Sequence, residues 1–333
     1  MRSSILRALA IAAIAVVIGF LPGLLGVSLF FYDTLVVIMI FSVMAYGMDI
    51  VLSDLGEVSL AHTTFFAAGS YTAGMLATGY GWNGWETLLA SLAVGGLFAA
   101  VLGYVTLHLR EFAFSLVTYA ANIVCFTIAY NWSALGASEG IIGIPPLELP
   151  LPGIALTAVN SRDFWPFAYT LLLLVLFFVH RFRASRLGKA ALMVHMNPQL
   201  ATASGIDGSR VRLMVLILSA PLTAAGGWLY AYQRAYVGPD LFQTYFLVLM
   251  LTAVVIFGRR ILLGPLLGTT FLLVQKNYFS LGAYGDKIVL GVILLLVLCT
   301  FPGGVTGLFS SRPGRAVTRF FGSSRRDAAA QGH

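Results

Sequence analysis

The sequence predicts an all-α polytopic membrane protein, and three observations lead to this fold class. Of 333 residues, 59% are hydrophobic and only 10% are charged, with a mean hydropathy of +0.90. Soluble domains are roughly 45–50% apolar and about 25% charged. The apolar residues also occur in runs near the roughly 20 residues that a helix needs to cross a bilayer. Finally, arginines cluster beside these runs, as cytoplasmic basic residues do in membrane proteins.

The apolar runs predict about ten transmembrane helices, some of them broken or re-entrant. We expect them to start near Ile5, Leu29, Val58, Thr87, Phe112, Phe164, Val211, Phe242, Ile261 and Ile288. The first run follows Arg2 and Arg7 and resembles a signal peptide, but no small-residue cleavage site precedes Pro22. A retained first helix is therefore the favoured interpretation.

The charges orient these segments. The loop at about 181–210 is rich in arginine and is predicted to be cytoplasmic, whereas the loop at about 131–163 has no basic excess and is predicted to be external. Residues 1–309 then form the transmembrane domain, with both termini cytoplasmic. Residues 310–333 form a basic tail, which is predicted to be mostly disordered and either to lie near anionic lipid or to be a solvated end with no role. The net charge of +7 thus indicates lipid headgroups as partners, not nucleic acid.

The sequence offers little for metal or redox chemistry. Cys125 and Cys299 both lie in apolar runs and form no disulfide framework. No second histidine or cysteine is placed to complete a metal site with His62. We expect no metal and no cofactor in this chain.

The predicted cytoplasmic loop contains the signals of a short helix. Asn197 can accept the free N–H groups of a first turn, and Pro198 suits the first helical position. Gly205 suits the end, because glycine adopts the left-handed conformation at little cost. Such a short helix is marginal in water and needs a surface to rest against. We expect it to rest against the bundle or against another protein.

Five segments in order resemble the membrane permease subunits of ABC importers for branched-chain amino acids and related solutes. GEVSLAHTTFFAAGSYTAG resembles the family's G-x-x-S-L-G-H-x-x-F-F-x-x-G-A-Y signature, and SEGIIGIP resembles its external glycine-rich segment. The region 188–230 resembles the family's cytoplasmic loop and following helix. GPLLGT and FPGGVTGL resemble its late and terminal motifs. The resemblance covers most of the chain.

The resemblance implies a mechanism and a set of partners. These are a second permease, which is usually a different chain, two ATP-binding subunits and an external solute-binding protein, assembled at a bacterial inner membrane. The segment 197–205 matches the family's coupling helix, whose contacts with the ATPase would come from Asn197, Pro198, Gln199, Ala201, Ser204 and Gly205. This chain lacks the phosphate loop G-x-x-x-x-G-K-[ST], so the partner subunits would bind ATP and magnesium.

Several positions depart from the family pattern. Met196 and Pro198 stand where the family usually carries glutamates, which predicts a less charged docking surface. Arg259 and Arg260 replace paired glycines near the predicted cytoplasmic face, where positive-inside anchoring is the favoured interpretation over contact with the ATPase or lipid phosphates. Family members are commonly neutral where this chain has Asp49, Asp54 and Glu57.

A carboxylate at membrane depth costs about 3 kcal/mol on insertion scales, so it faces water, finds a partner or lies at the interface. Broken helices often supply substrate sites in transporters, and Gly56 suits such a break. The hypothesis is that Asp54 or Glu57 lines the substrate path. The remaining candidates for the path are Ser59, His62, Thr63, Phe66 and Tyr71. In the competing interpretation the carboxylates lie in cytoplasmic-side water or pair with polar groups of the bundle.

Two other function classes compete with the importer. An ion-coupled secondary transporter would use Asp54 or Glu57 as its coupling group. An intramembrane hydrolase would use Ser59 with His62, three residues apart. That spacing is common by chance, and no G-x-S-x-G motif accompanies it.

Overall fold

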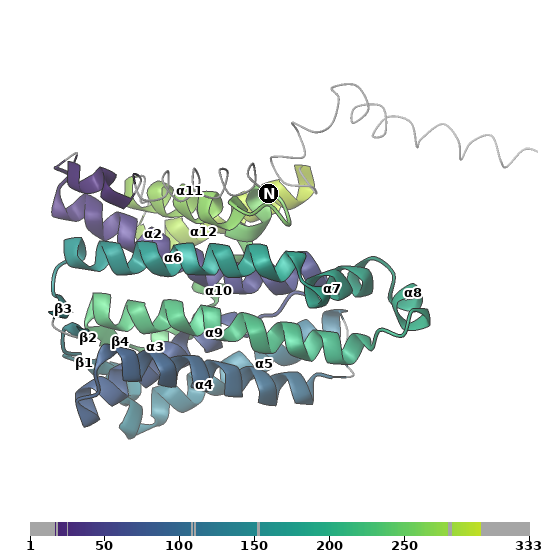
Figure 1. The fold of residues 1–333 in the computed structure, drawn as a ribbon, viewed down its shortest axis with the longest axis horizontal. Coiled ribbons are helices and arrows are strands. Elements are labelled where there is room, and N and C mark those ends of the chain that lie inside the picture. Colours follow the sequence, from purple (N-terminus) through teal and green to yellow (C-terminus); the bar gives the residue numbers. More distant parts are fainter. Residues whose placement is uncertain are drawn as a thin grey trace, which may run out of the picture.

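The computed structural model is a helical bundle with short strands at one end and a pair of short helices at the other (Figure 1). It describes residues 17, 19–24, 26–107, 109, 111–151, 154–278 and 282–300. Its long helices are α2 (Leu29–Asp49), α3 (His62–Tyr80), α4 (Gly84–Val105), α5 (Glu111–Asn131), α6 (Ser161–Ala184), α9 (Gly208–Arg234), α10 (Thr244–Ile256), α11 (Gly264–Tyr278) and α12 (Gly282–Thr300).

Helix α9 is the main packing partner in the bundle, since α2, α3 and α4 all lie against it. Small residues permit this close approach. A Cβ added at Gly69 of α3 would collide with the backbone of Ala224, and one at Gly95 of α4 would meet the side chain of Ala224. Close contact between small residues is how helices associate where lipid removes the hydrophobic drive between them.

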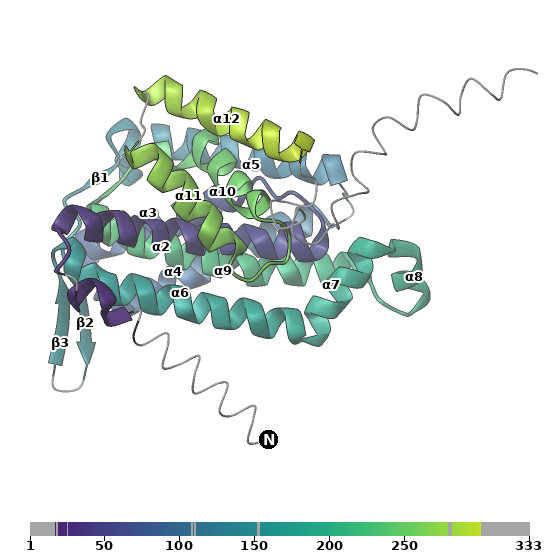
Figure 2. The same ribbon diagram turned by 90° about the horizontal axis from the view of Figure 1, so that it is seen from above.

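The strands lie together at one end of the bundle (Figures 1 and 2). Strands β2 (Leu147–Leu151) and β3 (Ile154–Ala158) form an antiparallel hairpin, while β1 (Ile141–Ile142) pairs with β4 (Tyr236–Val237). The segment at 131–163 was predicted as an external loop, without strands. It also contains two 3-10 turns, η2 (Ser133–Leu135) and η3 (Ala137–Glu139).

The opposite end carries α7 (Arg186–Met196) and α8 (Pro198–Ala203), as Figure 1 shows. Both follow α6 and precede α9, so they form the connection between two long helices. The predicted short helix is therefore confirmed. The bundle end that contains the turn after α2 lies beside them, because α7 packs against that turn.

The structure confirms an all-α polytopic membrane protein, but the count of about ten membrane-spanning helices stays a prediction. Within the described residues, five helical segments are long and apolar enough to cross a bilayer: Leu29–Leu55, Gly84–Val105, Phe112–Asn131, Ser161–Ala184 and Gly208–Arg234. Helix α10 is apolar but shorter. Most of the predicted first span, from Ile5, and the whole tail at 310–333 lie outside the described residues.

Candidate functional site

The turn between α2 and α3 is the first part of the candidate site. Helix α2 continues into a π-helical segment, η1 (Ile50–Leu55), and the chain leaves the helix at Gly56 with φ 79°. Glycine adopts this left-handed conformation without the Cβ penalty that other residues incur. Residues 57–61 are not helical, and α3 begins at His62. The predicted break at Gly56 is therefore present.

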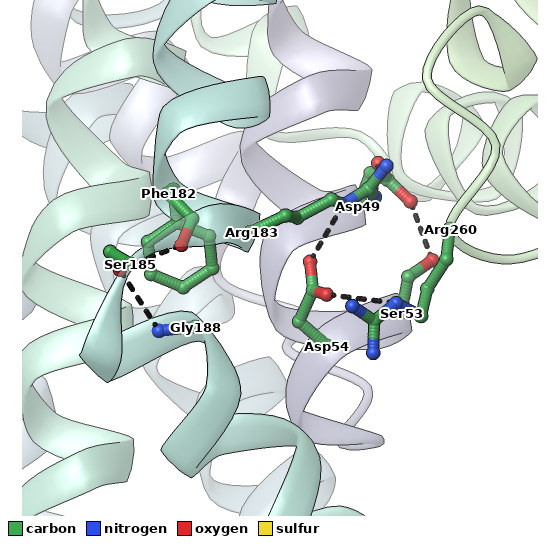
Figure 3. A network of polar contacts seen from close by, with 8 residues as sticks. All are labelled: Asp49, Ser53, Asp54, Phe182, Arg183, Ser185, Gly188 and Arg260. Atoms are coloured by element: carbon green, nitrogen blue, oxygen red, sulfur yellow. Dashed lines mark hydrogen bonds and ion pairs between the residues drawn. The ribbon is translucent and has the colours of Figure 1, made fainter.

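Four charged side chains form one network at this turn (Figure 3). The Nη2 group of Arg183 in α6 donates to Asp49 at 2.6 Å, and its Nε donates to Asp54 at 3.1 Å. On its other side, Asp54 Oδ1 lies 3.3 Å from Nε of Arg260. The hydroxyl of Ser53 donates to Asp49 at 2.5 Å. The network thus ties α2, η1, α6 and the turn before α11 together.

A second ion pair lies a few residues further along. Glu57 Oε1 is 2.5 Å from Nε of Arg212, near the start of α9, and both side chains are buried. The Nη1 group of Arg212 also donates to the carbonyl of Leu109 at 3.3 Å, beyond the end of α4. This pair links the turn to α9, which is the helix that follows α8.

The two carboxylates that the sequence singled out are thus buried and paired with arginines. Asp54 is 0% exposed and Glu57 is 6% exposed. A buried charge is tolerated more readily when a group of opposite charge lies close to it. This arrangement corresponds to pairing with polar groups inside the bundle, the competing interpretation of the sequence. The role of Asp54 and Glu57 along a substrate path stays a prediction.

Helix α7 reaches the same turn through His195. A Cβ at Gly56 would overlap the His195 ring, so the glycine leaves the space in which this ring lies. Burial against the turn lowers the pKa of His195 below its ordinary value, and the nearby guanidinium groups of Arg259 and Arg260 lower it further. This lowering of the pKa favours the neutral ring. The helix that precedes α8 is in direct contact with the break after α2.

Helix α8 has the ends that its sequence predicts. The side chain of Asn197 accepts from Leu200 N at 3.0 Å, Pro198 occupies the first turn, and Gly205 has φ +79°. Ala201 faces the protein and is 2% exposed, whereas Leu200 and Met196 are 60% and 75% exposed. The last of the predicted coupling residues, Gln199 and Ser204, are also exposed. Exposed apolar side chains on a short helix mark a surface that a partner can cover.

The polar residues at the start of α3 face inward. His62 Nε2 lies 3.3 Å from Ser219 Oγ, and His62 Nδ1 lies 3.4 Å from the carbonyl oxygen of Ser59. The buried hydroxyl of Ser59 has no hydrogen-bond partner among the described residues. The Ser59 hydroxyl therefore does not pair with His62, as a hydrolase dyad would require. Thr63 instead donates to Asn122 of α5 at 2.9 Å.

The aromatic candidates occupy two different places. Phe66 is 1% exposed and stacks on Phe41 of α2, with ring centroids 5.8 Å apart. Tyr71 stacks on Phe242 at 6.2 Å and borders an apolar cavity of about 240 Å³ between α3, α4 and α5. The buried Tyr71 hydroxyl has no hydrogen-bond partner among the described residues.

The seven predicted path residues follow one another along the chain but do not gather at a single site in the structure. Asp54, Glu57 and Ser59 lie at the α7 end, and Tyr71 lies about two and a half helical turns after the start of α3. Sequence reasoning missed Arg183 and Arg212, which it counted as cytoplasmic anchors. It also missed Asn122, whose signal was an amide within an apolar run. Within the described residues, no three His, Cys, Asp or Glu side chains are placed to hold a metal ion.

Comparison with known proteins agrees with this architecture. Residues 30–298 match the family model for the permease component of branched-chain amino acid transport systems. The chain is 23% identical over 295 residues to the high-affinity branched-chain amino acid transport system permease protein LivM of Salmonella typhimurium. It is 24% identical over 299 residues to LivM of Escherichia coli. Each alignment covers 82% of this chain and 69% of the relative.

No solved structure gives a significant match to the chain. The family model, in contrast, covers most of the chain, including α2 to α11 and nearly all of α12. The chain therefore belongs to the family of permease components of branched-chain amino acid transport systems, and it is a multi-pass membrane protein.

Proposed function

We propose that this chain is a pore-forming permease subunit of an ATP-driven importer for branched-chain amino acids or related small solutes. It lies in a bacterial inner membrane with both termini cytoplasmic. The observation that carries the proposal is the family match over residues 30–298 together with a capped, exposed helix, α8, between two long helices. The names of the LivM relatives support branched-chain amino acids as the substrate class.

The exposed face of α8 is the proposed docking surface for an ATP-binding subunit. Leu200 of α8, together with Met196 at the end of α7, would enter a groove of that subunit. ATP and magnesium would be bound by two such subunits, because this chain lacks a phosphate loop. A displacement of α8 would move α7, whose His195 lies against Gly56. It would also move α6, whose Arg183 forms ion pairs with Asp49 and Asp54. Alternating access is the result.

The proposed substrate path follows the turn after α2 and then α3, past Ser59, His62, Thr63, Phe66 and Tyr71. Because Asp54 and Glu57 are buried and paired with arginines, we propose that they form part of the path only when the ion pairs open. A second permease, a different chain, would complete the pore. An external solute-binding protein would dock on the β-strand end, opposite α8 (Figure 1).

The test is reconstitution of the complete complex in vesicles, with ATP hydrolysis and leucine uptake measured together. The variant carries Met196→Ser and Leu200→Ser, which removes the exposed apolar contacts without touching the core. We expect uptake to fall while the chain stays folded. Arg210→Gln is the matched control, because Arg210 is exposed in the first turn of α9, shortly after α8, and forms an ion pair only with exposed Asp207 among the described residues. Full uptake by the double variant would contradict the docking proposal.

The competing class, an ion-coupled transporter, receives less support. Its coupling group would be Asp54 or Glu57, and each has an arginine partner that offsets its charge. The discriminating experiment is uptake under two conditions, one with ATP and no ion gradient and one with an ion gradient and no ATP. Uptake that survives only in the second condition would replace the importer proposal.

A further inference from the structure

A cavity of about 190 Å³ lies between α2, α9, α10 and α11, away from the turn and from α8. It is found where α2 begins and α9 ends, which is the end that carries the β-strands (Figure 1). Arg234, the last residue of α9, borders the cavity and directly precedes the β4 region. None of the candidate path residues lines this cavity, but Phe66 contacts two residues that do, Phe41 and Tyr230.

One wall of the cavity is apolar. Phe41 and Phe246 stack there with centroids 5.5 Å apart and planes within 4° of each other, and Tyr230 meets Phe41 edge-on at 5.9 Å. The aliphatic part of this wall is formed by Val37, Leu249 and Leu273, all buried. Such a wall favours an aliphatic group of a ligand over water.

The other wall carries charges of both signs. Asp33 Oδ1 accepts from Gln233 at 2.6 Å and from Ser161 at 3.2 Å. Its second oxygen, Oδ2, is 3.8 Å from Nη1 of Arg234, which is longer than a hydrogen bond. Asp33 therefore does not hold Arg234 through a hydrogen bond, whereas the Tyr230 hydroxyl accepts one from the Arg234 side chain.

Lys276 of α11 adds a second cation to this wall. Its ammonium lies 5.0 Å from the ring centroid of Tyr245, and Asp286 of α12 attracts it electrostatically. Arg234 lies near enough to repel it. Two cations, Arg234 and Lys276, thus border the cavity itself, and either can meet a carboxylate ligand.

The size of the cavity limits the ligand. A volume of 190 Å³ equals that of about six liquid waters. Sites for drug-sized ligands start at about 300 Å³, so a peptide or a sugar chain is too large. A single small amino acid has the matching size, with one carboxylate, one ammonium and one apolar side chain.

We propose that this cavity binds the free zwitterion of a small aliphatic amino acid. The ligand carboxylate faces Arg234 and Lys276, the ammonium faces Asp33, and the side chain lies against Phe41, Leu249 and Leu273. This inference rests on the proposed function for its substrate class. Under that topology the cavity lies at the external end, so it is the first site that a delivered amino acid meets.

The experiment is equilibrium binding of radiolabelled leucine to the full chain, purified in detergent without any solute-binding protein. Two analogues compete for the site: leucinamide, which lacks the carboxylate, and 4-methylpentanoate, which lacks the ammonium. We expect both to compete about tenfold or more weakly than leucine, which corresponds to about 1.4 kcal/mol or more.

Two variants assign the groups. Asp33→Asn weakens leucine binding about tenfold and does not weaken 4-methylpentanoate, because the ammonium contact is lost while Arg234 is freed from its ion pair. Lys276→Gln weakens leucine and 4-methylpentanoate and leaves leucinamide unchanged. Asp207→Asn is the matched control, since Asp207 is an exposed carboxylate at the opposite end, and it keeps full binding.

Equal binding of leucine and both analogues to the unaltered chain would overturn the proposal. Leucine binding by the Asp33 and Lys276 variants that is as tight as that of the unaltered chain would also overturn it. Absence of leucine binding, with ATP-driven uptake by the complete complex intact, would overturn this site and leave the proposed function standing. The predicted analogue pattern without any ATP-driven uptake would support the site and contradict the proposed function.

Discussion

Replacing Arg183 by methionine tests whether the ion network holds the turn after α2 in place. The change keeps a long side chain but removes both contacts, to Asp49 at 2.6 Å and to Asp54 at 3.1 Å. Asp54 retains Arg260, whereas Asp49 retains only the Ser53 hydroxyl among the described contacts of its side chain. The variant therefore leaves one carboxylate, 1% exposed, without a cation.

The magnitude follows from that burial. Removing one partner of a buried ion pair costs about 3–5 kcal/mol, because the remaining charge stays out of water. The side chain of Arg183 is only 12% exposed, so solvent screening reduces this figure little. Adding Asp49→Asn removes the stranded charge, and the amide can still bond to Ser53. We therefore expect the double variant to recover much of the loss.

The assay is denaturant unfolding of the purified chain in one detergent at one pH. Arg181→Met is the matched control, since Arg181 is exposed on the same helix two residues earlier. We expect the control to differ from the unaltered chain by less than about 0.5 kcal/mol. Equal stability of the Arg183 and Arg181 variants would refute the reasoning, and so would a double variant less stable than Arg183→Met alone.

Further predictions concern backbone and core positions. Gly56→Ala should lower the melting temperature, because φ is 79° there and the added Cβ meets the His195 ring; normal stability would contradict this. Since the pKa of His195 is depressed, the unfolded chain binds its proton first, and stability should fall as pH drops below about 6.5. His195→Gln should flatten this fall, and an unchanged pH profile would refute the assignment. Asn122→Leu breaks the amide's three buried hydrogen bonds and should cost about 1–3 kcal/mol in unfolding experiments. Gly69→Ala should destabilise the chain by about 1–3 kcal/mol, whereas Gly79→Ala on the same helix, with open space around it, should be neutral or slightly stabilising.

Much of the fold could be predicted because hydropathy reports it directly. The predicted segment starts from Leu29 to Ile288 each fall within or close to a helix of the structure. Local backbone rules were equally informative for α8, since Asn197 and Gly205 act through their own conformations. The hairpin at Leu147–Ala158 was missed. Its strands are only five residues each, and Pro150 within the first of them argues against a strand in sequence-based reasoning, although Leu147 and Leu149 are buried on one face.

The ion network could not be predicted from the same signals. Arg183 lies 129 residues from Asp54 and stands at a helix end, where a basic residue ordinarily faces headgroups. Hydropathy does not tell an arginine that faces lipid from one that turns inward. The sequence did contain one signal, which is a balance of charges. Three carboxylates near one buried turn require nearby cations, and Arg183, Arg212 and Arg260 supply them.

The burial of the segment Leu29–Leu55 has a consequence for how the bilayer acts on this protein. In the most apolar stretch of this segment, 89% of the residues are buried inside the protein. The corresponding share is 22% in Gly84–Val105 and 22% in Phe112–Asn131. A mismatch between bilayer thickness and apolar length acts on helices that touch lipid. Thinner or thicker membranes would therefore tilt α4 and α5, while α2 keeps its depth and acts as the fixed axis around which they adjust.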